Sequence, residues 1–340
     1  MEYILVVPVL ASFILVLAMM PFWIRKAKIM GLKGKDINKH SKPEVAEAGG
    51  IVVLAGFIIG TLIYVAIRTF VFQQTNNVNL EIFVLISSVL IVGFIGIVDS
   101  LLAASWNSSE SHHAKGWRNG IGNRYRILLC IFAAIPLMVV NVGTSSMSIP
   151  FFGTINFGIL YPLFLIPLGV VATTTTYNFL AGYNGLEAGQ GILILGFLSY
   201  VSYVTGSAWI AIIGLCMVAS LIGFYIFNRY PAKVFPSDVL TYPVGALIAI
   251  MAILGNFEKV AVIVFIPYII EVILKSRGKL KKQSFGIPDK NGRLKLPYDK
   301  IYGLEHLAIK ILGERATERK VTYLIHAFQI VFILVAFLML

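Results

Sequence analysis

The chain has 340 residues and a formal net charge of +12 at pH 7; 58% of its residues are hydrophobic and only 13% are charged. Charged residues make up about a quarter of a typical soluble domain, so this composition excludes an ordinary soluble fold. It indicates an integral membrane protein. The first apolar run is followed, not preceded, by the basic residues Arg25 and Lys26, which is the reverse of the order in a cleavable signal peptide.

Ten apolar segments are predicted to cross the membrane, since a span takes roughly 20 mostly apolar residues. In chain order they are 3–24, 49–67, 82–102, 127–142, 160–175, 190–204, 208–227, 239–254, 260–274 and 321–340. The predicted fold class is therefore all-α, a polytopic membrane bundle formed by residues 1–340 as a single integral membrane domain. The small residues of Gly56-x-x-x-Gly60 permit close helix contact, either within one chain or between the two chains of a homodimer.

Basic residues are confined to one set of loops. Four loops hold 26 of the 28 Lys and Arg residues, namely 25–48, 103–126, 228–238 and 275–320. Cytoplasmic loops collect Lys and Arg, so these loops are predicted to be cytoplasmic and both termini extracytoplasmic, in a cell membrane or an ER-type membrane. Positive charge held this close to the bilayer favours anionic lipid over nucleic acid as its partner.

The longest of these loops, 275–320, is predicted to contain two ordered elements. Asn291-Gly292 is typical of a hairpin turn between Phe285 and Leu296. An amphipathic helix is predicted over Ile301–Leu312, where apolar residues alternate with charged ones in a pattern that suits a helix lying at the bilayer surface.

Four acids stand at or beside the predicted cytoplasmic ends of spans: Asp99, Glu187, Asp238 and Glu271. An ionisable group in a span costs roughly 2.5–3.5 kcal/mol on insertion scales, so each needs a reason to be there. Carboxylates suit Mg²⁺, and the surrounding Lys and Arg suit phosphate, so together they indicate a metal and phosphate site. The alternative is that each acid only pairs with a nearby base, and for Glu271, four residues before Lys275, this reading is favoured.

The segment Asn178–Gln190 is polar and rich in glycine between two apolar spans. Glycines allow close backbone approach to a ligand and turns with positive φ. The side chains of Asn178, Asn184, Glu187 and Gln190 supply oxygen ligands and hydrogen-bond groups. By itself, the segment could equally be a capped loop between helices.

Several segments in register, from the first loop to the last, resemble the polyprenyl-phosphate N-acetylhexosamine-1-phosphate transferases. The resemblance is closest to the dolichyl-phosphate GlcNAc-1-phosphotransferase type of eukaryotes and archaea. Asn178–Gln190 is close to the specific signature Asn-x-x-Ala-Gly-x-Asn-Gly-Leu-Glu-Ala-Gly-Gln. The other matching segments are 34–39, 43–50, 93–99 and 234–238.

The resemblance implies a role for particular residues. Asn178 and Asp238 match the Mg²⁺ ligands, with Mn²⁺ as an acceptable substitute, and Asp99 and Asp238 are the implied catalytic acids. The implied substrate-binding set is Ile37, Lys39, Glu47, Arg126, Asn184, Glu187 and Phe235. Within it, Phe235 would stack on uracil and Arg126 would contact phosphate. The alternatives are that Phe235 is an interfacial aromatic and Arg126 an anchor at the start of a span.

The sequence departs from the family pattern in two places. Where the family usually has paired aspartates, this chain has Asp99-Ser100, and where the family has a His/Arg-rich phosphate motif, it has Ser284–Pro288, with Lys281 and Lys282 upstream. An insertion at 106–122 also carries His112 and His113, which are either ligands or a solvated pair.

The implied reaction is attack by a polyprenyl phosphate oxygen on the β-phosphorus of UDP-GlcNAc or a related UDP-HexNAc, with release of UMP, the first step of lipid-linked glycan assembly. Such phosphoryl transfer needs mainly positioning and charge neutralisation. The two departures leave a second hypothesis, a catalytically inactive relative that binds polyprenyl phosphate or nucleotide sugar as a scaffold or regulator. A transporter is disfavoured because its polar site would lie near the bilayer midplane.

Overall fold

The structure is a computed structural model that describes residues 2–74, 77–107, 120–149 and 153–340. Its main elements are helices, each of which matches one of the apolar segments or a loop element. They are α1 (Val6–Ile29), α2 (Gly50–Ala66), α3 (Val78–Asn107), α4 (Asn123–Val140), α5 (Ile166–Tyr177), α6 (Leu186–Val204), α7 (Ala208–Asn228), α8 (Asp238–Gly255), α9 (Glu258–Val264), α10 (Ile266–Arg277), α11 (Leu304–Leu312) and α12 (Glu318–Phe337). The predicted all-α membrane bundle is confirmed.

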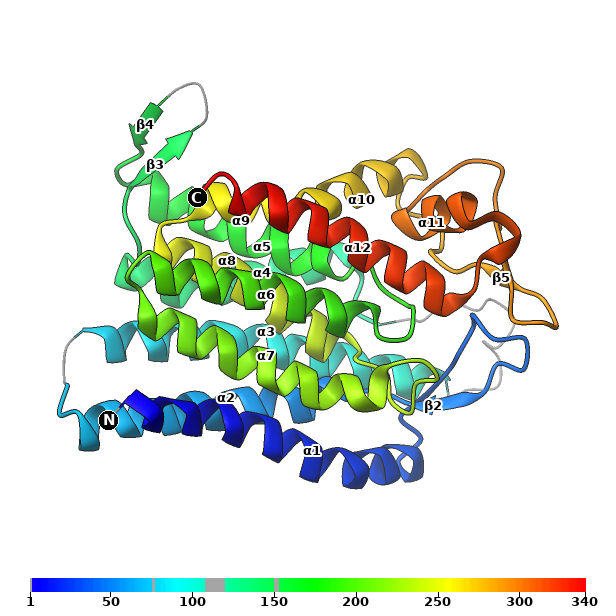
Figure 1. Cartoon of the computed structure of the whole chain (residues 1–340), viewed down its shortest axis with the longest axis horizontal. Coiled ribbons are helices and arrows are strands. Elements are labelled where there is room, and N and C mark those ends of the chain that lie inside the picture. Colours follow the sequence, from blue (N-terminus) through cyan, green and yellow to red (C-terminus); the bar gives the residue numbers. More distant parts are fainter. Residues whose placement is uncertain (1, 75–76, 108–119, 150–152) are drawn as a thin grey trace.

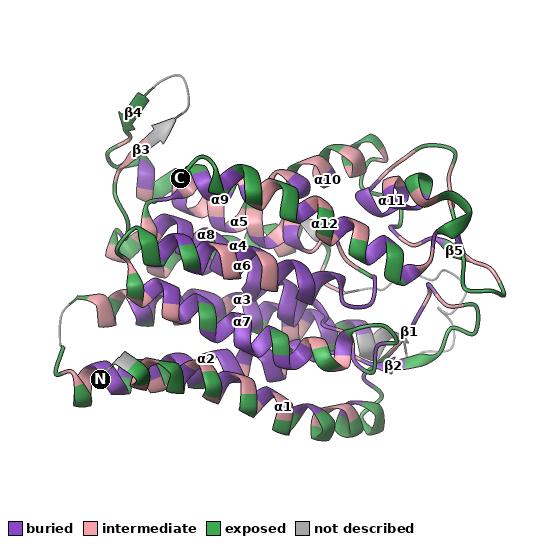
Figure 2. Cartoon of the chain, in the orientation of Figure 1, coloured by how far each residue is buried: buried purple, intermediate pink, exposed green. Residues whose placement is uncertain are grey.

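The long helices run side by side, so that the connections gather at two opposite ends of the molecule (Figure 1). α8 lies at the centre and contacts α2, α3, α5, α6, α7 and α9. Its apolar window is 89% buried, whereas that of α1 is 22% buried. Figure 2 shows the same contrast as buried positions inside the bundle and exposed ones along α1. Because α1 exposes large apolar side chains such as Leu10, Ile14 and Phe22, its outer face suits lipid rather than water.

Six helices in the described part of the chain are long and apolar enough to cross a membrane: those at Tyr3–Ile29, Gly50–Val71, Val78–Ala103, Ala208–Asn228, Asp238–Gly255 and Glu318–Phe337. The segment predicted at 260–274 is broken into α9 and α10. Pro267 lies in the first turn of α10 and has no N–H to continue the preceding helix, which explains the break.

The Gly56-x-x-x-Gly60 spacing is used within the chain. A Cβ at Gly56 would lie 2.6 Å from Cγ2 of Val16, and one at Gly60 would lie 2.8 Å from the carbonyl oxygen of Pro8. Both partners belong to α1, which therefore packs closely on α2. The motif lends no support to a homodimer.

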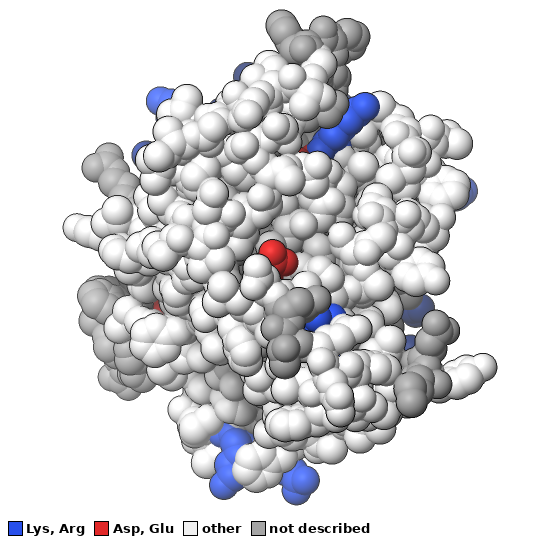
Figure 3. Space-filling model, turned by 90° about the vertical axis from the view of Figure 1, so that its left-hand side faces the viewer, with Lys and Arg blue, Asp and Glu red and all other residues white. Residues whose placement is uncertain are grey.

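Three short antiparallel hairpins occur in the described residues: β1 (Lys33–Lys35) with β2 (Glu44–Ala46), β3 (Ser146–Ile149) with β4 (Gly153–Asn156), and β5 (Ile287–Pro288) with β6 (Leu294–Lys295). The last is the hairpin predicted from Asn291-Gly292, and Gly292 adopts a φ of 75° at its turn. Figure 1 places β2 and β5 at one end, and β3–β4 with both chain termini at the other. Figure 3 views the end with the termini, and few charged side chains appear on it.

The predicted amphipathic helix is present as α11, but its surroundings differ from the expectation. Leu304, Ala308 and Ile309 are buried in the protein, so the apolar face is not available to the bilayer surface. Glu305 and His306, read from the sequence as a solvated polar face, are 0% and 1% exposed. The helix is covered on both sides because it contacts α10 and α12.

Candidate active site

Two helices approach closely enough to bring two predicted site acids together. Gly96 on α3 faces the start of α8, and a Cβ there would lie 2.7 Å from the carbonyl oxygen of Asp238. One turn after Gly96, Asp99 follows on α3. The glycine in the Gly93–Asp99 segment thus permits the contact that sets Asp99 beside Asp238. Both carboxylates are buried.

Arg126 on α4 lies between these two carboxylates. Its Nη2 donates to both oxygens of Asp99 at 3.1 and 3.2 Å, while its Nη1 lies 3.8 Å from Oδ2 of Asp238. Asp99 also accepts a hydrogen bond from the backbone N–H of Ile121 at 2.5 Å. A guanidinium that bridges two buried acids is an element of the site and more than an anchor at the start of a span.

Asn178 and Asp238, sixty positions apart, lie in contact. Nδ2 of Asn178 donates to Oδ1 of Asp238 at 3.1 Å, and Oγ1 of Thr241 donates to Oδ1 of Asn178 at 3.1 Å. Asn178 caps the C-terminus of α5 and Asp238 opens α8. The preceding residue, Ser237, has a φ of 58°, which is strained for a side chain with a Cβ, and it is held by the N–H of Ala48. We call Asp99, Arg126, Asn178 and Asp238 the Asp238 cluster.

The donors of the Asp238 cluster suit a magnesium ion, which prefers carboxylate and amide oxygens. The amide of Asn178 turns its nitrogen toward Asp238, so a cation between the two would require the amide to turn over. Among the described residues, no three or more His, Cys, Asp or Glu side chains converge as a metal site. A magnesium ion here would fill its coordination with water and substrate phosphates, as is usual for this ion.

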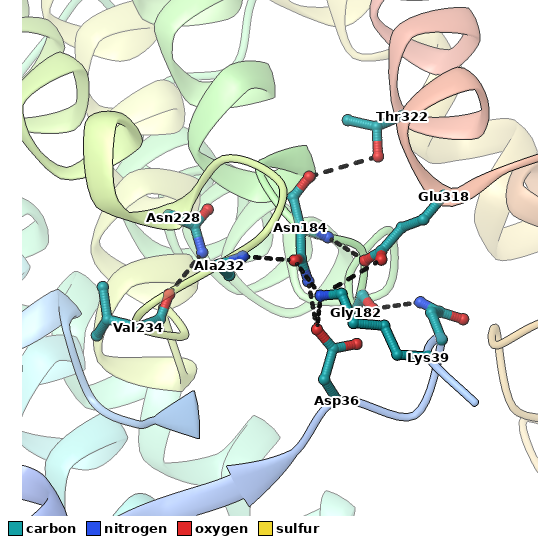
Figure 4. Close-up of polar contacts among 10 residues, drawn as sticks. Asp36, Lys39, Gly182, Asn184, Asn228, Ala232, Val234, Glu318 and Thr322 are labelled. Atoms are coloured by element: carbon teal, nitrogen blue, oxygen red, sulfur yellow. Dashed lines mark hydrogen bonds and ion pairs between the residues drawn. The ribbon is translucent and has the colours of Figure 1, made fainter. Parts of the chain in front are cut away.

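A second set of polar contacts surrounds Asn184 (Figure 4). Its Oδ1 accepts from Nζ of Lys39 at 2.9 Å and from the N–H of Ala232 at 2.7 Å, and its Nδ2 donates to Asp36 at 3.2 Å. Its backbone N–H donates to Oε1 of Glu318 at 2.8 Å. Lys39 in turn pairs with Asp36 and lies 3.8 Å from Oε2 of Glu318. We call Asp36, Lys39, Asn184 and Glu318 the Asn184 cluster.

Two of these four residues were not predicted from the sequence. Asp36 stands inside the 34–39 segment, and its charge was the available signal. Glu318 opens the last apolar helix, where an acid reads as the ordinary edge of a span. Of the predicted substrate-binding residues, Lys39 and Asn184 are brought together here, while Arg126 belongs to the Asp238 cluster.

The glycine-rich segment is a folded loop that is closed by one of its own side chains. Oε1 of Glu187 accepts the N–H of Gly182 at 2.9 Å, so this acid closes the loop. Gly182 has a φ of 101° and faces the ring of Phe285, and Gly185 has a φ of 80° at the N-cap of α6. The capped-loop interpretation therefore describes this part correctly, while Asn178 at its start belongs to the Asp238 cluster.

The other predicted residues lie nearby on the first loop and on the strand-like stretch before α8. The backbone of Phe235 bonds to Ala46 at 2.7 Å and to Gly49 at 3.0 Å, and its side chain is half-buried. Ile37 is also half-buried. A Cβ at Gly34 would lie 2.4 Å from Oε1 of Glu47, so this carboxylate packs against the β1–β2 hairpin.

Three further sequence readings concern the last loop and the insertion. Lys275 pairs with Glu271 at 3.3 Å, so the favoured pairing is confirmed. Nζ of Lys282 lies 4.6 Å from the ring centre of Tyr298, a cation–π contact that occupies this lysine. His112 and His113 lie outside the described residues.

An apolar cavity of about 470 Å³ lies between α5, α8, α9 and α10. Thr176, two residues before Asn178, lines it, whereas the four residues of the Asp238 cluster do not. Toward the start of α5 it is lined by Tyr161 and Glu258, whose side chains share a hydrogen bond of 2.5 Å. Nearly all of its wall is hydrocarbon, which suits an apolar chain.

Comparison with known proteins agrees with this geometry. Residues 82–256 match the family described as glycosyl transferase family 4, and this range contains Asp99, Arg126, Asn178 and Asp238. The chain is 37% identical over 334 residues to a Saccharolobus solfataricus protein provisionally named as a UDP-N-acetylglucosamine–dolichyl-phosphate N-acetylglucosaminephosphotransferase, covering 98% of this chain and 95% of that protein. The chain belongs to glycosyl transferase family 4.

Two more distant relatives bear related names. A Dictyostelium discoideum UDP-N-acetylglucosamine–dolichyl-phosphate N-acetylglucosaminephosphotransferase is 26% identical over 71% of this chain and 64% of its own. A Streptococcus thermophilus phospho-N-acetylmuramoyl-pentapeptide-transferase is 28% identical over 81% of each chain. The names of all three relatives describe the transfer of a phosphorylated sugar.

Proposed function

We propose that the protein transfers a HexNAc 1-phosphate, N-acetylglucosamine 1-phosphate in the first instance, from a UDP-sugar to a polyprenyl phosphate of the dolichyl type, with release of UMP. The observation that carries the proposal is the contact between Asn178 and Asp238, with Arg126 and Asp99 alongside. The names of the relatives support the same reaction.

The lipid acceptor is the substrate that the cavity suits. A polyprenyl tail would lie among the apolar side chains between α5 and α8, and its phosphate would reach out beyond Thr176 toward Arg126. There the guanidinium would bind phosphate oxygens, for which its planar fork is well shaped. The enzyme thus holds the nucleophile at the junction of membrane and water.

A lone Asp99 is compatible with catalysis. The second pKa of a phosphate monoester is near 6, so a lipid phosphate is already largely dianionic at pH 7 and requires no general base. Asp99 is buried and bonded to Arg126 and to the N–H of Ile121, so its role is to orient the arginine. Replacement of a second aspartate by Ser100 therefore removes charge without removing a required step.

Asn178 and Asp238 would hold the magnesium ion. When bound, the ion would neutralise diphosphate charge and stabilise the leaving UMP. The cluster has formal charges of −2 from its acids and +1 from Arg126, so it favours an added cation. Nucleotide would lie toward the first loop, where Phe235, Ile37 and the Asn184 cluster occur.

The membrane orientation is part of the proposal. The basic loops and both clusters would face the cytoplasm and both termini the opposite side, in a cell membrane or an ER-type membrane. The small number of Lys and Arg side chains on the end with the termini, seen in Figure 3, supports this orientation.

The test uses purified protein in detergent or lipid discs with radiolabelled UDP-GlcNAc and a polyprenyl phosphate. We expect label in the lipid fraction and one UMP per product, lost with EDTA and restored by Mg²⁺. Binding of UDP or lipid phosphate with no transfer across several UDP-HexNAcs and lipids would favour the inactive relative. Activity unchanged by EDTA would remove the metal from the proposal.

A further inference from the structure

Side chains on one face of the N-terminal half of α12 contact the glycine-rich segment Asn178–Gln190. Glu318 accepts the N–H of Asn184 at 2.8 Å, and Oγ1 of Thr322 lies 3.5 Å from the carbonyl oxygen of Asn184. Nε2 of His326 lies 3.3 Å from the carbonyl oxygen of Leu186. Residues spaced by four share one side of a helix, so these contacts form a single stripe.

The fit of this stripe is close. A Cβ at Gly189 would lie 2.3 Å from the ring of His326, so only glycine leaves room for the imidazole. In Figure 4, Glu318 and Thr322 reach from α12 to opposite backbone groups of Asn184. The last helix, which the sequence shows only as a membrane span, therefore determines where this loop lies.

In this arrangement Asn184 uses both acceptor positions of its Oδ1 and one N–H of its Nδ2. Its Oδ1 accepts two hydrogen bonds and its Nδ2 is bonded to Asp36. It joins four segments: the first loop, the glycine-rich loop, the stretch at Ala232 and the start of α12. Its role here is to hold those segments in register.

Glu318, like Asp36, acts on both the glycine-rich loop and Lys39. It differs from Asp36 because it bonds to the backbone of Asn184. Its Oε1 holds Asn184, and its Oε2 lies 3.8 Å from Nζ of Lys39. The carboxylate is 3% exposed, so its interactions are poorly screened by water. Loss of its side chain would leave Lys39 with Asp36 as its acidic partner and free the backbone N–H of Asn184.

We propose that Glu318 is a positioning residue for the nucleotide-sugar site, fixing Asn184 and Lys39 so that UDP-sugar binds to an ordered loop. This inference rests on the proposed function. Glu318 does not touch the Asp238 cluster in any contact described above. Its loss therefore weakens nucleotide binding and leaves the transfer step and the lipid site largely unchanged.

The experiment compares Glu318→Ala, Glu318→Gln and wild type. Steady-state kinetics give kcat and the KM for UDP-GlcNAc and for polyprenyl phosphate, and calorimetry gives the Kd for UDP. We expect Glu318→Ala to raise the KM for UDP-GlcNAc and the Kd for UDP about tenfold, the scale of one hydrogen bond to a charged group. Glu318→Gln, which keeps an acceptor for Asn184, should recover part of the affinity. kcat and the lipid KM should change less than twofold.

Gln329 provides the matched control. It is buried on the same helix and donates to the carbonyl oxygen of Val264 at 2.8 Å, away from the Asn184 cluster. Gln329→Leu should lower the thermal midpoint without changing the Kd for UDP. If Glu318→Ala lowers the midpoint while the Kd stays at the wild-type value, Glu318 is only structural and the inference fails. The inference also fails if Glu318→Ala and Gln329→Leu change the Kd for UDP equally.

The same measurements separate this inference from the proposed function. Wild type that binds UDP without transferring label overturns the function, while the Kd values still decide the role of Glu318. Wild type that neither binds UDP nor transfers label overturns both. Wild type that transfers label, with Glu318→Ala indistinguishable from it, overturns the inference alone.

Discussion

The Asp238 cluster and the Asn184 cluster have the same charges and different structures. Each places two carboxylates around one basic side chain: Asp99 and Asp238 around Arg126, and Asp36 and Glu318 around Lys39. Each cluster contains one ion pair at 3.8 Å, Arg126 with Asp238 and Lys39 with Glu318. The Asn184 cluster differs because the amide side chain of Asn184 and two backbone N–H groups join four segments of the chain. In the Asp238 cluster, the amide of Asn178 turns its nitrogen toward Asp238.

This difference suggests different tasks: the Asn184 cluster holds segments of the chain in place, and the Asp238 cluster binds the reacting groups. A network of buried hydrogen bonds that includes backbone groups from several segments fixes the backbone and resists rearrangement. In the Asp238 cluster, the amide of Asn178 bonds to Asp238 through its nitrogen and can turn over to offer its oxygen to a cation. We expect the Asn184 cluster to set stability and nucleotide affinity, and the Asp238 cluster to set the rate of transfer.

The largest effect should come from Asp238→Asn. The substitution keeps the shape and removes the charge, so we expect kcat to fall at least about a hundredfold, as for loss of one group that stabilises a transition state. The thermal midpoint should stay near wild type, since Asn178 still has an oxygen to bond. A variant that unfolds, or one that keeps its activity, would break the comparison.

The same substitution in the other cluster should act mainly on stability. Asp36→Asn weakens the bonds to Lys39 and to Nδ2 of Asn184, and we expect a loss of about 1–2 kcal/mol in unfolding free energy. Denaturation in detergent measures it, and kcat near wild type at saturating UDP-GlcNAc is the accompanying result. A stable variant with a large fall in kcat would place Asp36 in the reaction instead.

A third substitution should leave both clusters intact and weaken only the binding of the lipid substrate. Ala172 lines the cavity, and Ala172→Phe would fill part of it. We expect the KM for polyprenyl phosphate to rise about tenfold, the scale of overpacking, with the KM for UDP-GlcNAc unchanged. Ala18→Phe on the exposed face of α1 is the matched control, and equal effects of the two variants would show that the cavity is not the lipid site.

The smallest effect concerns His306, a buried polar group outside both clusters. Burial lowers the pKa of His306 to about 4, with a further contribution from the charge of Lys275. The fold therefore favours the neutral ring, and this stability is present above pH 6.5 and is lost as the pH falls toward 4. Burial and the nearby Glu271 charge raise the pKa of Glu305 well above its usual value, which acts in the opposite direction.

Replacement of the histidine isolates its contribution from that of Glu305. Between pH 7 and pH 5, we expect wild type to lose about 2 kcal/mol more unfolding free energy than His306→Gln. Thermal melts of both proteins at the two pH values measure the difference. Identical pH dependence would show that the ring is not held neutral in the folded protein.

Much of the fold could be predicted because it depends on local sequence. Apolar length located the bundle helices apart from the break between α9 and α10, and Asn291-Gly292 located the β5–β6 turn, since both follow from residues next to one another. The resemblance placed Asn178, Asp238, Asp99 and Arg126 in one site, and the structure brings these four side chains together. The metal and the substrates are still predictions.

Other features could not be predicted because they depend on contacts distant in sequence. Glu318 and Asn184 are 134 positions apart, and an acid at the start of an apolar helix gives no sign of its partner. Glu305 and His306 are polar residues of a helix predicted to lie at the bilayer surface, yet both are buried in the folded protein. Gly56 and Gly60 could pack against a helix of the same chain or of a second chain, and only the structure shows that they pack against α1.

By itself, then, the sequence determined a membrane bundle with its charge on one side and a set of family motifs, because hydropathy and short motifs are properties of neighbouring residues. Only the tertiary structure decided which buried polar groups hold the loop and which surround the reaction. A buried charge is defined by the partners that packing brings to it, and those partners come from segments the chain order does not place together.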